Sequence, residues 1–362
     1  EMKKPIPAYL IALAVGDLAY HPFSKNSGVY SEPELLPSCA YEFDAIPKMI
    51  NAAEKLYGPY QWEQYDILVL PYSFPFGGME NPMLTFANPT LLAGDKSLVS
   101  VIAHELAHSW SGNLVTNRTW NDFWLNEGFT VYFEQRIMES IYGKEVADIL
   151  ALIEFDELKD ELKRIKASEN PEDSKLHLAL EGRNPDDGMT DIAYVKGAFF
   201  LKTLENEVGR TAFDAFLKKY FNTFQFKTVD TKQFVSFLKK NLLNKGHQDF
   251  DYQSWIYTEG LPDNCLQLHS TRLDQMEKLA DDFTHNKISF APKITYKWKK
   301  IGKRRKKIKT VTQIKFQDHI VQEWQTFIRR LPRNLPQAKM REIDRYLRLS
   351  FSGNSELLTE WF

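Results

Sequence analysis

The sequence predicts an α+β fold, in which a mixed domain is followed by an α-helical domain. Three observations lead to this prediction. The chain has 362 residues, which is too long for one ordinary hydrophobic core. Its two strand-like stretches lie before residue 72, whereas helical spacing dominates from residue 97 onward. A turn-rich segment, TEGLPDN at 258–264, then marks a plausible domain boundary.

The first third of the chain supplies the predicted strands. The apolar run in residues 5–15 is of strand length and ends at Gly16, so it predicts a buried strand. Residues 43–57 have helical spacing. The segment YDILVLP predicts a second strand at 65–71, which runs into the turn-rich segment 71–84.

Two helices follow, and they matter most for function. The first is predicted over residues 97–112, and it closes near a glycine at its end. The second is predicted over 121–143, with Asn121 or Asp122 as its N-cap. Further helical patterns cover residues 145–166, 192–208, 211–222, 230–243, 272–283, 318–330 and 336–348.

The composition restricts the class of protein. The apolar fraction is 43% and the net charge is −2, so we expect a globular protein without a nucleic-acid or membrane partner. The two cysteines, Cys39 and Cys265, are far apart, which favours a reducing, cytoplasmic location. Secretion is the alternative, because two lysines precede the first apolar run as in a signal peptide.

A strongly basic run interrupts the C-terminal helices. Nine of the thirteen residues in KWKKIGKRRKKIK, 297–309, are lysine or arginine. We expect a solvated insertion loop, because one basic run in a near-neutral chain is weak evidence of function. A nuclear address or a patch for a polyanion is the alternative.

The segment VIAHELAHSW, 101–110, carries the clearest chemical motif. His104 and His108 are four residues apart, so on a helix both imidazoles lie on one face and can hold one ion. Glu105 is rotated by about 100 degrees from this face and can reach a water bound to the metal. This division of roles is what metal-assisted hydrolysis requires.

A catalytic zinc also needs a third protein ligand, and the next helix offers one. Glu127 lies in WLNEGF, with eighteen residues between it and His108. An antiparallel helix pair would bring its carboxylate level with the histidines, and two histidines with one glutamate form a known catalytic zinc set. We therefore expect one Zn²⁺ per chain. Glu134 is either a partner of a ligand or a solvated residue.

These motifs resemble the gluzincin zinc aminopeptidases of the aminopeptidase N superfamily, in the branch of leukotriene A4 hydrolase and aminopeptidase B. The resemblance rests on HExxH followed by NEG, on GGMEN at 77–81, and on the segments NPTLLAGDKSL and NLVTNRTWNDFWLNEG. It implies a thermolysin-like catalytic domain at 18–260. A remnant strand of an N-terminal β domain would precede it at 1–17, and a truncated α-helical domain would follow at 265–362.

The resemblance also implies roles for single residues. Glu105 would act as general base on the zinc-bound water, Tyr194 would stabilise the oxyanion, and Glu80 would bind the free α-amino group of a peptide. Asp186 would shape the pocket for the first residue. The substrate would also contact the segment around GGMEN, which comprises Pro75, Phe76, Gly77, Gly78 and Met79.

The chain departs from this pattern at two positions, where Phe76 and Met189 stand in place of tyrosines. Both departures weaken a lipid epoxide hydrolase more than a peptidase. The sequence therefore predicts a zinc aminopeptidase that acts on peptides with a free N-terminus. The alternatives are a lipid epoxide hydrolase that uses the same zinc and a non-catalytic zinc scaffold, whereas GGMEN disfavours an endopeptidase.

Overall fold

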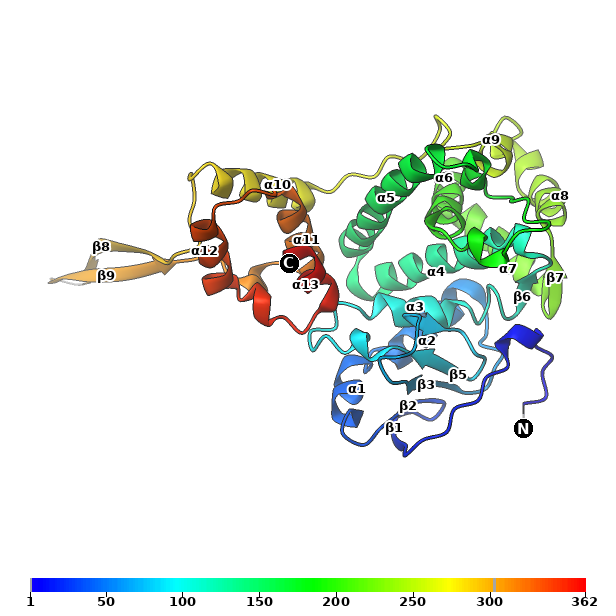
Figure 1. Ribbon diagram of the computed structural model, residues 1–362, viewed down its shortest axis with the longest axis horizontal. Helices are drawn as coiled ribbons and strands as arrows, with labels where there is room; N and C mark the ends of the chain where they lie inside the picture. The colour runs from blue at the N-terminus through cyan, green and yellow to red at the C-terminus, as the bar shows by residue number, and fades with distance from the viewer. Residues whose placement is uncertain (1, 302–303) are drawn as a thin grey trace. The chain divides into compact units, whose positions relative to one another are not determined.

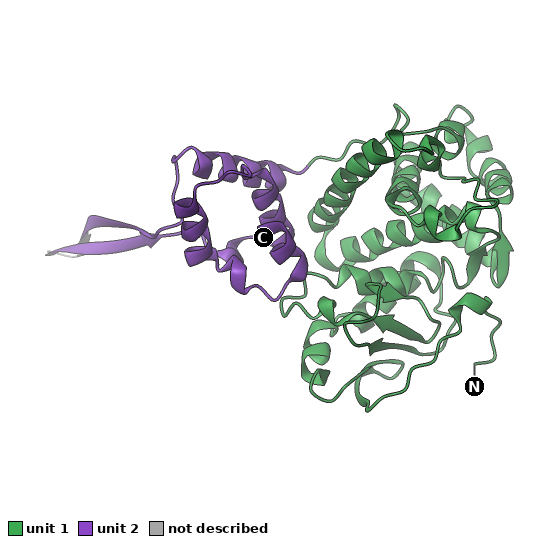
Figure 2. Ribbon diagram, viewed as in Figure 1, with its two compact units in different colours: residues 1–269 green, residues 270–362 purple. Residues whose placement is uncertain are grey.

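A computed structural model describes residues 2–301 and 304–362 of the chain. It has a mixed α+β composition, as predicted, and the chain divides into two compact units, Glu1–His269 and Ser270–Phe362 (Figure 2). No helix in the described part of the chain is long and apolar enough to cross a membrane.

A five-stranded sheet forms one part of unit 1, in the order β1-β2-β3-β5-β4 (Figure 1). Strands β2, β3 and β5 are parallel, whereas the edge strands β1 and β4 pair antiparallel with their neighbours. The central strand β3 is buried at every position, as its continuous apolar sequence predicts. The strands are β1 Ala19–Ser24, β2 Ser27–Ser31, β3 Tyr65–Val69, β4 Gly78–Met79 and β5 Leu84–Ala87.

Helices form the rest of unit 1, and α4 lies at their centre (Figure 1). Helix α4 packs against α2, α3, α5 and α6, and every residue from Trp124 to Met138 is buried. The helices are α1 Leu36–Glu42, α2 Ile46–Tyr57, α3 Ser100–Ala107, α4 Trp124–Tyr142, α5 Lys144–Lys166, α6 Gly197–Val208, α7 Arg210–Phe224, α8 Thr231–Asn241 and α9 Tyr252–Tyr257. A short parallel pair joins β6 Val115–Asn117 to β7 Lys227–Val229.

The predicted strand at 5–15 is wrong. A single 3-10 turn, Ala8–Leu10, is the only regular element that the structure describes there. The side chains of Ile11, Leu13 and Val15 are 74%, 88% and 91% exposed. The apolar run is of strand length, but no described strand lies beside this segment to pair with it, and a strand is stable only with such a partner.

The ends of the two functional helices also differ from the prediction. Helix α3 ends at Ala107 rather than near Gly112, because the chain turns back directly after His108. Helix α4 begins at Trp124, so neither Asn121 nor Asp122 is its N-cap. Asp122 instead accepts hydrogen bonds from the backbone N–H and the hydroxyl of Thr231, at 2.9 and 2.8 Å.

Unit 2 has a small core of its own, formed by Met276, Phe283, Phe290, Trp324 and Phe327 with their neighbours. Its helices are α10 Thr271–Thr284, α11 Val321–Arg330, α12 Gln337–Leu347 and α13 Ser355–Trp361. The basic run is not a loop, because its described residues belong to an antiparallel hairpin of β8 Lys293–Ile301 and β9 Arg304–Thr312. Two linking residues, 302 and 303, lie outside the described part of the run.

Candidate active site

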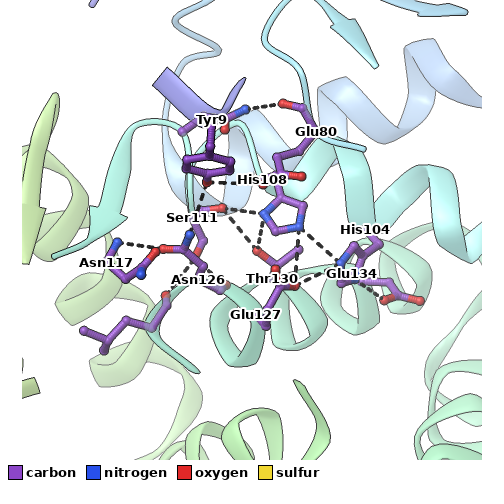
Figure 3. Close-up of polar contacts among 12 residues, drawn as sticks. Tyr9, Glu80, His104, His108, Ser111, Asn117, Asn126, Glu127, Thr130 and Glu134 are labelled. Carbon is purple, nitrogen blue, oxygen red and sulfur yellow. Dashed lines mark hydrogen bonds and ion pairs between the residues drawn. The ribbon is translucent and has the colours of Figure 1, made fainter. Parts of the chain in front are cut away.

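Helix α3 brings the two histidines of HExxH together. His104 lies in the last turn of the helix, and His108 directly follows its end. Their Nε2 atoms are 3.2 Å apart (Figure 3). The spacing of four residues therefore has the predicted effect of placing two imidazoles side by side.

Glu127 completes the cluster from the first turn of α4. Its Oε2 lies 3.3 Å from His104 Nε2 and 3.5 Å from His108 Nε2. Four tetrahedral ligands at about 2.0–2.1 Å from a zinc ion would be about 3.3 Å from one another. The three atoms therefore fit three corners of a zinc site. Glu127 Oε2 is also buried without a hydrogen-bond partner, so it is available to a cation.

The Nδ1 atoms of the two histidines make contacts that fix the orientation of both rings. His104 Nδ1 lies 3.1 Å from Glu134 Oε2, so Glu134 is a partner of the first histidine rather than a solvated residue. His108 Nδ1 lies 2.9 Å from the carbonyl oxygen of Ser111 and 3.2 Å from the hydroxyl of Thr130. Since both Nδ1 atoms are engaged in this way, both Nε2 atoms are left to face the centre of the cluster.

The electrostatics of the cluster also suit a cation. Burial by itself would lower the pKa of both histidines, but the neighbouring carboxylates outweigh it. Glu127 and Glu80 raise the pKa of His108 to about 9, and Glu127 and Glu134 raise that of His104. The histidines in turn overcome burial and lower the pKa of Glu127 to about 2. The buried carboxylates thus favour positive charge at the imidazoles, which is the charge that a divalent cation would supply.

Glu105 lies beside the cluster and points at the edge strand β4. A Cβ atom on Gly78 would collide with Glu105 Oε1, so only glycine allows this approach. The carboxylate is buried and its Oε2 has no hydrogen-bond partner. Burial raises the pKa of Glu105 to about 7, against the opposing effect of the two histidines. Such a carboxylate can exchange a proton near neutral pH.

Tyr194 is held over the histidines by a close helix crossing. It lies in the π-helical turn Ile192–Lys196, and its ring stacks on that of His104 with centroids 6.1 Å apart. A Cβ atom on Gly128 of α4 would lie 2.7 Å from the Cα of Gly197. The turn can therefore approach α4 only because both positions are glycine.

Glu80 is buried near the same centre, and its surroundings were not predicted from the sequence. The carboxylate of Glu80 lies close to the carboxylate of Glu105 and to the ring of His108. The potential ligand atoms of these three residues all lie within 4.8 Å of one another. Tyr9 donates a hydrogen bond from its hydroxyl to Glu80 Oε1 at 3.3 Å, and Asn113 donates to the carbonyl oxygen of Glu80 at 2.8 Å (Figure 3). Tyr9 belongs to the run that we interpreted as a strand, so no pattern indicated this contact.

Other predicted residues lie elsewhere. Asp186 is exposed in the turn Pro185–Gly188, where its backbone N–H donates to the side chain of Asn184. None of the contacts described for Asp186 joins it to the cluster. Phe76 and Met189 are both exposed, at 49% and 46%. Gly77 and Gly78 are better placed to contact a substrate, because they lie at the edge of the sheet. The carbonyl oxygen of Gly77 accepts a hydrogen bond at 2.9 Å from the backbone N–H of Asn88, and Gly78 begins β4.

Comparisons with known proteins show which family the chain resembles. A model described as the peptidase family M1 domain matches residues 41–255. Leucine aminopeptidase 2 of Yarrowia lipolytica is 46% identical over 292 residues, which are 77% of this chain and 45% of the relative. A leukotriene A-4 hydrolase homolog of Botryotinia fuckeliana is 44% identical over 264 residues, 71% of this chain and 41% of the relative.

Solved structures show the same likeness. Yeast LTA4 hydrolase in complex with bestatin superposes with a TM-score of 0.85 at 34% identity, and the match covers 100% of this chain and 59% of the other. An M1 zinc metallopeptidase from Deinococcus radiodurans superposes with a TM-score of 0.59 at 25% identity, over 74% of this chain and 58% of the other. The chain spans less than half the length of the curated relatives that it matches.

Proposed function

Because the chain belongs to peptidase family M1, we propose that it is a zinc-dependent aminopeptidase that hydrolyses the N-terminal peptide bond of peptides. One observation carries the proposal. The ligand atoms of His104, His108 and Glu127 lie 3.2–3.5 Å apart, directly beside the buried carboxylate of Glu105. One zinc ion per chain, held by these three residues, would polarise the scissile carbonyl and acidify the attacking water.

The chain's own residues would move the protons. Glu105 would take a proton from the attacking water and pass it to the leaving amine, which its pKa of about 7 supports. Tyr194 would donate a hydrogen bond to the oxyanion. Burial, followed by the charge of Glu127, raises the pKa of the Tyr194 phenol, so it stays protonated and able to donate.

Glu80 would restrict cleavage to the first residue. Its carboxylate is buried beside the cluster and would pair with the α-ammonium group of a peptide. Strand β4, Gly78–Met79, ends the order of the sheet, so the backbone around GGMEN can pair with an extended substrate. We keep Pro75 and Phe76 as substrate contacts and Asp186 as a residue of the first-residue pocket in this proposal.

We further propose that the family's thermolysin-like catalytic domain corresponds to residues 18–260 and its α-helical domain to residues 265–362. Residues 1–17 would be the end of a preceding β domain, although the described residues among them, 2–17, form no strand. The likeness of the whole chain to yeast LTA4 hydrolase supports this assignment.

The test is hydrolysis of a panel of fluorogenic aminoacyl amides, each with a free and an acetylated amino group, with and without a zinc chelator. We expect the chelator to abolish cleavage and only the free-amine forms to be cleaved. The matched variant Glu80→Gln should raise KM for the free amines by about tenfold or more, because a charged hydrogen bond is lost. Equal cleavage of the acetylated forms would contradict the proposal.

The same panel separates the alternatives. A non-catalytic zinc scaffold would bind zinc and cleave none of the amides. A lipid epoxide hydrolase that uses the same residues would open an epoxide substrate without cleaving the amides. Asp186→Asn provides the test of the pocket, since it should change the order of preferred first residues while the chelator still abolishes cleavage.

A further inference from the structure

The β8–β9 hairpin of unit 2 has no role in peptide hydrolysis. Residues 293–312 contain ten lysines and arginines and no acidic residue, although the whole chain carries a net charge of only −2. Figure 1 shows the two strands as a ribbon that extends away from the helices of this unit. Positive charge is thus concentrated on one element that pairs only with itself in the described sheets.

The register of the hairpin sorts its side chains into two faces. Residues that lie directly opposite each other in an antiparallel pair point to the same side. The pairs Ile294–Val311, Tyr296–Lys309 and Trp298–Lys307 form one face, which we call the aromatic face. The pairs Thr295–Thr310, Lys297–Ile308 and Lys299–Lys306 form the other face.

On the aromatic face each ring lies opposite a lysine of the other strand, and both rings are open to solvent. Tyr296 is 55% exposed and Trp298 is 66% exposed. The ammonium group of Lys307 lies 4.4 Å from the centre of the Tyr296 ring. Tyr296 and Trp298 are two positions apart on one strand, which is about 7 Å. Lys307 covers one face of Tyr296, so this ring offers its other face to a planar ligand, and Trp298 offers its own.

This arrangement of charges and rings lowers the stability of the hairpin itself. Lys299 and Lys306 are directly opposite each other, and like charges in such pairs destabilise a sheet. Large exposed rings add no burial that would offset this repulsion. A polyanion along the ribbon would remove the repulsion and cover the rings. The hairpin therefore has the properties of a binding element rather than of a structural one.

We propose that the β8–β9 hairpin binds a single-stranded nucleic acid, for which RNA is the probe used below, with bases stacked on Tyr296 and Trp298 and phosphates paired with the lysines. Aromatic rings that stack on bases between cationic side chains are how proteins grip an unpaired strand. The ribbon is nine residues long, or about 30 Å, which is enough to contact several successive nucleotides. This proposal departs from our prediction of no nucleic-acid partner, which rested on the charge of the whole chain.

Two other polyanions fit the structure less well. In duplex nucleic acid the bases are already stacked on one another, so Tyr296 and Trp298 would have no free base to contact. A bilayer would accept the apolar pair Ile294–Val311, but this pair lies at the base of the ribbon, and the pairs farther along it, Trp298–Lys307 and Lys299–Lys306, carry lysines. Inserting these pairs into lipid would bury cations.

The test is fluorescence anisotropy of the full chain with a labelled single-stranded RNA of about twelve nucleotides, measured over a range of salt concentrations. We expect Trp298→Leu to weaken binding by about tenfold without changing the salt dependence, because it removes stacking only. Lys306→Gln and Lys307→Gln should each lower the slope of log affinity against log salt by about 0.7.

Phe351→Leu is the matched control, since Phe351 is another exposed ring of unit 2 with a guanidinium group, that of Arg348, nearby. It should bind RNA like the wild type. Each variant's thermal unfolding is compared with that of the wild type, so that a folding defect is recognised. The proposal is overturned if Trp298→Leu binds normally, if the RNA duplex binds as tightly as the single strand, or if vesicles of anionic lipid bind more tightly than either.

Discussion

Two buried glutamates, one in each unit, show how differently the two halves of the chain use a charge. Glu323 in unit 2 accepts two hydrogen bonds from Arg272, at 3.0 and 2.7 Å, and a third from the backbone of Ile320 at 2.8 Å. Glu127 in unit 1 is equally buried, but its Oε2 lies between two imidazoles without a hydrogen bond. A satisfied carboxylate joins helices together, whereas an unsatisfied one is available to a ligand.

The contrast extends to the surroundings of each glutamate. In unit 1, Glu80, Glu105 and Glu134 are also buried around the same centre. In unit 2 the densest charge lies on the exposed hairpin, outside the core of aromatic side chains. We infer that unit 1 places its functional charges where water is excluded and unit 2 places them where a large partner can reach them.

The largest expected effect is that of Glu105→Gln on turnover. The substitution keeps the shape of the side chain but removes the base, so kcat should fall by about a thousandfold. Zinc content should be unchanged, because Glu105 does not belong to the group of His104, His108 and Glu127. Initial rates and metal analysis of the same samples measure both quantities. If turnover were retained, the unsatisfied carboxylate of Glu105 would have no catalytic role. The contrast between the glutamates of the two units would then not reflect function.

The pair Glu127→Gln and Glu323→Gln tests the comparison directly. Glu127→Gln should leave the protein without stoichiometric zinc after dialysis. Glu323→Gln should retain zinc but lower the free energy of unfolding of unit 2 by about 2 kcal/mol, because Arg272 loses its charged partner. Metal analysis and denaturant unfolding give the two readings. The same outcome for both variants would show that the two carboxylates do not differ in role.

Glu134→Gln should have a smaller effect, on metal affinity alone. Glu134 contacts the Nδ1 of His104 and therefore acts on zinc through that histidine. Loss of such a partner weakens metal binding by about 10–100-fold. Competition with a chelator of known affinity measures the change. Glu139→Gln is a suitable control, since this glutamate is also on α4 but pairs with Arg210. An affinity equal to the control's would mean that Glu134 does not support the site.

The smallest effect concerns Asp122, and it disappears in acid. Burial would raise the pKa of Asp122, but His177 and the hydrogen bonds from Thr231 and Thr119 outweigh it and lower the pKa to about 2. A carboxylate with a lowered pKa stabilises the fold above the ordinary value of about 3.9, and this contribution is lost as the pH falls through about 2. Asp122→Asn should therefore cost roughly 2 kcal/mol at pH 6 and almost nothing near pH 2.

Denaturant unfolding of the wild type and of Asp122→Asn across this pH range provides the measurement. The two stability curves should converge in acid. A constant difference at all pH values would show that Asp122 acts through its shape or its hydrogen bonds alone.

The sequence predicted the centre of the site well, because its signals are local. A spacing of four residues on one helix brings His104 and His108 together, and a helix pair brings Glu127 to them. The supporting residues carried no such signal. Ser111 acts through its carbonyl oxygen and Thr130 through a hydroxyl in the middle of an apolar helix. Tyr9 reaches Glu80 from 71 residues away.

The errors in the fold have physical causes as well. The run at 5–15 is apolar and of strand length, but a strand also needs a partner, which no local pattern reveals. The hairpin was missed because its many lysines suggested a loop, although Ile294, Tyr296 and Trp298 alternate with other residues as in a strand. The predicted ends of the helices were wrong because they depend on single contacts between distant residues. An example is the hydrogen bond that Asp122 accepts from Thr231.

The burial of α4 from Trp124 to Met138 has a consequence for the rate at which its backbone amides exchange. Amide hydrogens in the middle of this helix are covered on all sides, so they exchange with deuterium only when unit 1 unfolds as a whole. Amides of the hairpin are covered by no other layer, and they exchange through local fraying. After a short deuterium pulse, peptides from α4 would stay light while those from β8 and β9 become heavy. The backbone amides of the segment that carries Glu127 and Glu134 thus exchange far more slowly than those of the hairpin.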